Sequence, residues 1–256
     1  MKIGVFDSGV GGLTVLSELR RLYPSVDLIY LGDTARVPYG NRSKETIVRY
    51  SLECASFFAK LGIELLVVAC NSASACALDD LRRALSIPVF GVIEPGVKMA
   101  LELAKEGPIG VIGTRATISS GVYRRLLQSA GKEVFEKSCP LFVPLVEEGL
   151  FNGPIAKAVV EMYLSDLKQS KIKAIILACT HYPLLKSAIQ DFLGLEVSIV
   201  DSALATALDI KEFIKPEGSS NLELFFTDIP AHLERIVSTI LQRPVEIKRA
   251  LCDGRS

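Results

Sequence analysis

A weak internal repeat is the feature that most constrains how this chain can fold. The segment "IGVF" begins at Ile3 and "IGVI" begins at Ile109, which is 106 residues later. Cys70 and Cys179, each preceded by an apolar run that ends in Ala, lie 109 residues apart. The acids that end "GVIE" and "SIVD", at positions 94 and 201, lie 107 residues apart. Three matches in the same order indicate two halves with the same succession of strands and helices.

Short runs rich in β-branched residues alternate with longer segments of helical period. Strands are predicted over residues 2–6, 27–31, 64–69 and 88–92, and helices over 13–22, 43–61 and 72–85. The strands are continuous apolar runs, as expected where helices cover both faces of a parallel sheet. The sequence therefore predicts an α/β fold of two similar doubly wound parallel-sheet domains, related by a pseudo-twofold axis.

The C-terminal segment has no counterpart in the second half. After the loop-like "KPEGSSN" at 215–221, it predicts a strand at 222–226, a helix at 231–241 and a strand at 245–249. We expect this tail to return to the first domain, which gives one domain of residues 1–96 plus 208–256 and a second of residues 97–207. Extension of the second domain by the tail stays open.

The composition favours a small-molecule partner. Lys plus Arg and Asp plus Glu both number 29, so no basic surplus indicates nucleic acid or an anionic membrane. No apolar run approaches membrane-spanning length, and Asp7 with its neighbouring glycines interrupts the stretch that a secretory signal would need. We therefore expect a cytoplasmic protein. Six cysteines in 256 residues are too few for a disulfide scaffold.

Cys70 and Cys179 each follow a predicted strand, at the edge where parallel sheets bind ligands. Asn71 or Ser72 can cap the helix after Cys70, and Thr180 can cap the helix after Cys179. Helix N-termini favour thiolates, so each thiol pKa should fall toward 7. The two thiols, meeting across one cleft, could be a redox pair, zinc ligands with His181, or a proton donor and acceptor on opposite faces of a carbon.

Seven motifs in this order resemble those of glutamate racemases: "FDSGVGGLTVL", "LGDTARVPYG", "ACNSASA", "GVIEPG", "GTRATI", "PLVEEG" and "LACTHYPLL". The resemblance covers residues 3 to 202. It implies a cofactor-independent isomerase without a metal, which interconverts L- and D-glutamate in a cleft between two α/β domains. It also implies a homodimer, and D-glutamate supplied for peptidoglycan in cell wall biogenesis and cell shape.

The same resemblance assigns roles to individual residues. It makes Cys70 and Cys179 the acid/base thiols, with Asp7 supporting Cys70 and with Glu147 and His181 on the Cys179 side. The implied substrate-binding residues are Asp7, Ser8, Pro38, Tyr39, Gly40, Asn71, Ser72, Thr114, Thr117, Thr180 and His181. Many members of the family have Thr where this chain has Ser72, but a hydroxyl group is kept.

Other readings remain beside this one. An aspartate or other amino-acid racemase is the nearest alternative, although that branch usually follows its second Cys with Thr-Glu rather than "THYPLL". An amino-acid-binding module without catalysis is the alternative from another class. "DSGVGG" could also cradle a phosphate, but it lacks the Lys of a P-loop and the spacing of a dinucleotide-binding turn.

Overall fold

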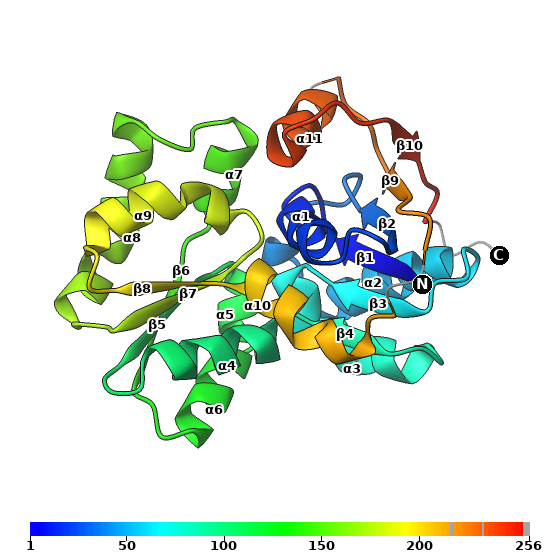
Figure 1. Ribbon diagram of the computed structural model, residues 1–256. Coiled ribbons are helices and arrows are strands. Elements are labelled where there is room, and N and C mark those ends of the chain that lie inside the picture. Colours follow the sequence, from blue (N-terminus) through cyan, green and yellow to red (C-terminus); the bar gives the residue numbers. More distant parts are fainter. Residues whose placement is uncertain (216–217, 232, 253–256) are drawn as a thin grey trace.

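The computed structural model describes residues 1–215, 218–231 and 233–252, which form an α/β fold around two parallel sheets (Figure 1). Over these residues the larger sheet contains β1 (Lys2–Asp7), β2 (Asp27–Gly32), β3 (Leu65–Val68), β4 (Val89–Gly91), β9 (Leu222–Phe226) and β10 (Ile247–Arg249). The smaller sheet contains β5 (Ile109–Gly113), β6 (Val134–Ser138), β7 (Ala174–Ala178) and β8 (Ser198–Asp201).

The two sheets share one strand order. It is β2-β1-β3-β4 in the larger sheet and β6-β5-β7-β8 in the smaller one, with β9 and β10 added beside β2. The register also matches, because Ile3 pairs with Leu65 and Ile109 pairs with Ala174. The predicted fold class, two similar parallel-sheet units, is therefore confirmed.

Helices cover both faces of each sheet because the central strands are apolar on both sides. Every residue of β3, β5 and β7 is buried. The helices of the first half are α1 (Leu13–Leu22), α2 (Lys44–Ala59), α3 (Asn71–Ala84) and α4 (Ile93–Leu103), with a 3-10 turn η1 (Tyr39–Asn41). Those of the second half are α5 (Arg115–Ser119), α6 (Val122–Ser129), α7 (Phe142–Glu147), α8 (Pro154–Gln169), η2 (Tyr182–Leu185), α9 (Lys186–Leu193) and α10 (Ser202–Asp209). No described helix combines the length and apolar character needed to cross a membrane.

The last helix of each half packs against the other half. Ile93 and Val97 of α4 lie in a core cluster with Val111 and Ile176 of the smaller sheet. Ala203 of α10 lies in the core cluster of α1 and the larger sheet. The predicted domain limits, 96/97 and 207/208, fall inside these two exchanged helices. The division into domains stays a prediction.

The C-terminal segment extends the larger sheet. After η3 (Ile210–Phe213), β9 pairs in parallel with β2, and β10 pairs with β9. Between these strands, α11 (Leu233–Leu241) buries Leu233 and Val237 in the core cluster that contains α1 (Figure 1). Residues 222–249 thus lie beside the first half of the chain.

Candidate active site

Cys70 lies where β3 ends and α3 begins, and it is 4% exposed. Its own sulfur accepts a hydrogen bond from Ala73 N at 3.5 Å, and Sγ lies 3.4 Å from Ser8 Oγ. The expectation that Asn71 or Ser72 caps α3 is wrong, because Cys70 is the last residue with extended backbone angles and Asn71 is already helical.

The surroundings of Cys70 also overturn the expected lowering of its pKa. Burial, followed by the negative charge of Asp7, raises the pKa of the Cys70 thiol to about 12 from an ordinary value of 9.0. Hydrogen bonding with Ser8 and with Ala73 N lowers it by less. The helix N-terminus is present, but desolvation and a neighbouring carboxylate outweigh it. Cys70 is therefore a thiol at neutral pH.

Asp7 connects the two halves of the chain. Its side chain is fully buried at the end of β1, where Oδ2 accepts from Gly9 N at 3.0 Å and Oδ1 accepts from Thr180 Oγ1 at 3.3 Å. A Cβ on Gly11 would lie 2.3 Å from Thr180 Oγ1 and 2.6 Å from His181 Nδ1. Gly11 thus lets the first glycine-rich loop pack directly against the segment that follows Cys179.

Cys179 directly follows β7 and is 6% exposed. Its Sγ lies 3.9 Å from His181 Nδ1, and His181 Nε2 lies 3.4 Å from Glu147 Oε1 at the end of α7. The second contact lacks hydrogen-bond geometry, since Nε2 is buried without a hydrogen-bond partner among the described residues, so we treat it as a charge interaction. Burial lowers the pKa of His181, but Cys179 and Glu147 together raise it to about 10. His181 is therefore an imidazolium at neutral pH.

Thr180 does not cap a helix, contrary to expectation. The chain enters the 3-10 turn η2 at Tyr182, with His181 at the position before it, and α9 begins at Lys186. The Thr180 hydroxyl is already engaged with Asp7, and the buried Tyr182 hydroxyl donates to Cys139 O at 2.8 Å. These two contacts fix residues 180–182 in a non-α-helical conformation, so that α9 begins only at Lys186.

A cluster of three hydroxyl groups joins the halves beside Cys70. Ser72 Oγ on α3 lies 2.9 Å from Thr114 Oγ1 and 3.3 Å from Thr117 Oγ1, and the two threonine oxygens are 3.0 Å apart. Thr114 also caps α5 by accepting from Thr117 N. Next to them, Asn71 Oδ1 accepts from Tyr123 OH at 2.7 Å, and the buried Asn71 Nδ2 has no hydrogen-bond partner among the described residues. Sequence reasoning missed Tyr123, which lies in no motif.

The "PYG" turn reaches the same hydroxyl cluster through its backbone. Pro38 follows a cis peptide bond and is exposed, and η1 begins at Tyr39. A Cβ on Gly40 would lie 2.5 Å from Thr114 Cβ, so Gly40 allows the turn to approach the second half closely. The Tyr39 ring points into the first half, where its hydroxyl donates to Asp33. The Tyr39 hydroxyl is therefore engaged within the first half.

Asp33 is a second buried residue that sequence reasoning did not single out. It is fully buried after β2 and accepts hydrogen bonds from Arg36 Nε at 2.7 Å and from Thr227 Oγ1 at 2.8 Å, in addition to Tyr39. Its signal was its position within "LGDTARVPYG", between a strand and the predicted substrate turn. These contacts hold the turn in place.

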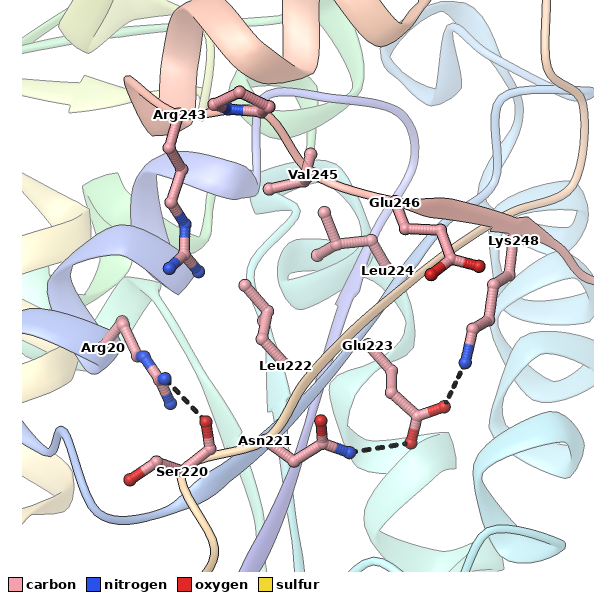
Figure 2. A pocket seen from close by; sticks show the side chains of 11 residues that line it. Arg20, Ser220, Asn221, Leu222, Glu223, Leu224, Arg243, Val245, Glu246 and Lys248 are labelled. Atoms are coloured by element: carbon pink, nitrogen blue, oxygen red, sulfur yellow. Dashed lines mark hydrogen bonds and ion pairs between the residues drawn. The ribbon is translucent and has the colours of Figure 1, made fainter.

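A cavity of about 480 Å³ lies away from these residues, between the C-terminal end of α1 and the segment that joins β9 to β10 (Figure 2). Arg20 and Arg243 lie at one end of it, and Glu223 and Lys248 pair at the other (Figure 2). None of the predicted site residues lines this cavity. Across the part of the chain that the structure describes, no group of three or more His, Cys, Asp or Glu side chains could hold a metal ion.

Comparisons of sequence and of structure with known proteins lead to the same family. A sequence model of the Asp/Glu/Hydantoin racemase family matches residues 9–209. The chain is 61% identical over 248 residues to the glutamate racemase of Aquifex aeolicus, with 97% of each protein covered. The solved structure of glutamate racemase from Aquifex pyrophilus superposes with a TM-score of 0.87 at 57% identity, covering 98% of each chain. That of glutamate racemase from Francisella tularensis in complex with D-glutamate superposes with a TM-score of 0.90 at 34% identity, covering 99% of this chain and 98% of the other.

Proposed function

Because the chain belongs to the Asp/Glu/hydantoin racemase family, and to the glutamate racemases within it, we propose that Cys70 and Cys179 interconvert L- and D-glutamate by proton transfer. The equivalence of the two cysteines carries this proposal. Cys70 comes five residues after the strand partner of Ile3, and Cys179 comes five residues after the strand partner of Ile109. Equivalent thiols at facing sheet edges suit a reaction whose substrate and product are mirror images.

The reaction removes a proton from one face of Cα and adds a proton to the opposite face. A thiolate on one face removes the Cα proton and leaves the electron pair of the broken C–H bond on carbon. The thiol on the opposite face then donates its proton to that carbon and becomes a thiolate, so the configuration inverts. The reverse reaction exchanges the roles of the two cysteines, and no group other than side chains and substrate is needed for the proton balance.

The charges in the two half-sites support one resting state. His181, with its pKa raised to about 10, places an imidazolium 3.9 Å from Cys179 Sγ, the sulfur that takes up the substrate proton in this proposal. Cys70, with its pKa raised to about 12, keeps its proton beside the carboxylate of Asp7. We therefore assign Cys179 as the base and Cys70 as the acid for the enantiomer that binds this state. The other enantiomer requires the proton to be on Cys179.

Neutral donors and one carboxylate supply the substrate contacts in this proposal. The two carboxylates of glutamate accept from Asn71 Nδ2, from the hydroxyl cluster of Ser72, Thr114 and Thr117, and from backbone N–H groups at Tyr39 and Gly40. Asn71 Nδ2 suits this role because it is a buried donor without a hydrogen-bond partner among the residues described. The substrate ammonium pairs with Asp7 and Ser8, which lie beside Cys70.

We place the activity in bacterial cell wall biogenesis, where D-glutamate is used for peptidoglycan and so contributes to cell shape. The location is then the cytoplasm, and the enzyme acts as a homodimer. The net charge of zero supports a small-molecule substrate over nucleic acid or a membrane surface as partner. The D-glutamate complex of the Francisella tularensis enzyme supports glutamate as that substrate.

Proton exchange in D₂O tests the proposal. Purified protein is incubated with L-glutamate and separately with D-glutamate, with a chelator and without added cofactor, and the Cα proton is followed by NMR. We expect the Cα signal to disappear from both enantiomers while the optical rotation decays to zero. Folded protein that exchanges neither enantiomer would overturn the proposal, and aspartate would be the next substrate to test.

A further inference from the structure

Two cysteines outside the proposed active site lie close together. Cys54 is fully buried on α2, and Cys252 is partly buried after β10. Cys54 belongs to the core cluster between α2 and the larger sheet, and Cys252 packs against that cluster, near enough for the two thiols to interact electrostatically. They are 198 residues apart in the sequence, so the fold rather than the local chain brings them together.

An arginine and a cavity adjoin this pair. Arg36 Nη2 lies 3.4 Å from Cys54 Sγ, and the same guanidinium pairs with Asp33 and Glu53. A cavity of about 350 Å³ is lined by Arg36, Glu53 and Cys252. Small reagents can therefore reach the Cys252 side of the pair. Burial raises the pKa of the Cys54 thiol well above its ordinary value, and the positive charge of Arg36 offsets only part of this rise, so Cys54 is the sulfur that reacts second.

The pair lies where the C-terminal segment is attached to the fold. β10 has three residues and forms the edge of the larger sheet, with Lys248 and Arg249 exposed (Figure 1). Ala250 is buried and its N–H donates to Phe226 O at 2.9 Å, while Leu251 is 75% exposed. Cys252 packs against the core cluster that contains Cys54. A short edge strand held this way opens more easily than the central strands.

We propose that Cys54 and Cys252 are a disulfide-forming pair that attaches the end of the chain to α2. The oxidant is a small-molecule disulfide such as oxidised glutathione. This inference is independent of the proposed racemisation, since neither sulfur belongs to the cluster around Cys70 and Cys179.

The exchange proceeds in two steps. The Cys252 thiolate attacks one sulfur of the small disulfide, forms a mixed disulfide and releases one thiolate. The Cys54 thiol then gives its proton to water as its sulfur attacks the Cys252 sulfur, which forms the bond between the two protein sulfurs and releases the second thiolate. The protein thiols lose two electrons and two protons in total, and the small disulfide becomes two thiols.

Peptide mapping of the folded, full-length protein tests the pairing. The reduced protein is incubated with oxidised glutathione, its remaining thiols are alkylated, and it is digested with trypsin without reductant. We expect a linked species of residues 50–60 and 250–255 that disappears when reductant is added. It should be absent from Cys252→Ser and present in Cys76→Ser, which alters the partly exposed cysteine on α3. A folded protein whose Cys54 and Cys252 are both alkylated, or whose Cys252 carries glutathione alone, would overturn the proposal.

Stability gives a second measurement. A disulfide between Cys54 and Cys252, which are 198 residues apart, restricts the unfolded chain. Oxidation should therefore raise Tm by roughly 5–10 °C. Amide hydrogen exchange in residues 247–252 should slow on oxidation, and Cys252→Ser should show neither change. An oxidised protein with the linked peptide but unchanged exchange in this segment would show that the bond does not attach the tail.

Discussion

The half-sites of Cys70 and Cys179 have the same topology but different charges. Cys70 lies beside a carboxylate, Asp7, and its pKa is raised to about 12. Cys179 lies beside His181, whose own pKa is raised to about 10, so that thiol has an imidazolium as neighbour. The repeated sheet sets where the two sulfurs lie, and residues outside the repeat give the two sulfurs different electrostatic surroundings.

This difference suits a pair that must hold one proton between two sulfurs. If both thiols were equally acidic and independent, much of the protein would carry two protons or none. In the proposed mechanism, a cation on one side and an anion on the other favour the state with one thiol and one thiolate. The asymmetry therefore increases the fraction of enzyme that is ready to react, at least for one enantiomer.

Removing either sulfur should have the largest effect. We expect Cys70→Ala and Cys179→Ala each to reduce kcat by about 10³–10⁴-fold, because each direction needs one thiolate and one thiol. Polarimetry with each enantiomer measures the loss. Cys76→Ser is the matched control, because Cys76 lies on α3, the helix that begins directly after Cys70. If one alanine variant kept near-full activity, that cysteine would not be an acid/base group, and the comparison of two half-sites would lose its basis.

Removing the imidazolium should separate the half-sites. Since enantiomers have equal free energy, kcat/KM must fall equally in both directions, and we expect a fall of about 10–100-fold for His181→Asn. The substrate deuterium isotope effect of this variant, in contrast, should differ between the L- and D-enantiomers. Proton transfer at Cys179 becomes limiting, so the effect from Cα-deuterated substrate should be large for the enantiomer deprotonated by Cys179 and small for the other.

Asp7→Asn is the reciprocal control for this experiment. It alters the Cys70 side, so the larger isotope effect should move to the opposite enantiomer. Equal isotope effects for both enantiomers in both variants would show that His181 and Asp7 do not act on separate sulfurs.

The sequence predicted the positions of the sulfurs better than their chemistry. The spacing between Ile3 and Cys70 and between Ile109 and Cys179 is part of the repeat, so the equivalent placement could be predicted from strand order. The pKa of Cys70 could not, because it depends on burial and on the approach of Asp7 from another strand. Likewise, nothing in the sequence shows that Thr180 donates to Asp7 instead of capping a helix.

The exchanged helices show the same limit at the level of the fold. The sequence predicted the alternation of strands and helices, but it did not single out α4 or α10. Their packing on the opposite half depends on the angle between the sheets, which no local pattern encodes. Tyr123 and Asp33 were missed for a related reason, since Tyr123 contacts Asn71 and Asp33 contacts Thr227 across long distances in the sequence.

The hydroxyl cluster between the halves should affect binding more than chemistry. Ser72→Ala removes the oxygen that lies near both Thr114 and Thr117, and we expect KM for glutamate to rise about 5–10-fold with little change in kcat. Ser72→Thr keeps the hydroxyl and should restore KM to within about twofold of the unmodified enzyme, a change worth roughly 0.4 kcal/mol. A kcat loss without a KM change in Ser72→Ala would place the cluster in the proton-transfer step instead of binding.

Glu147→Gln should have the smallest effect, and its pH dependence tests the charge on the Cys179 side. Glu147 helps raise the pKa of His181 from its ordinary value of 6.5 to about 10, so the ion pair stabilises the fold fully below pH 6.5 and loses this contribution as the pH rises through about 10. Glu147 is partly exposed, so we expect Tm to fall by about 1–3 °C at pH 6 and not at all above pH 10.

Thermal unfolding followed by circular dichroism from pH 6 to pH 10.5 measures this difference, with Glu148→Gln, the exposed neighbouring carboxylate, as the control. The sign follows from the direction of the shift, because a histidine with a raised pKa stabilises the protonated folded state. A Tm difference that stayed constant across this range would mean that Glu147 stabilises α7 without sensing the charge of His181. In that case the two half-sites would differ in packing and not in the ionisation that we assign to them.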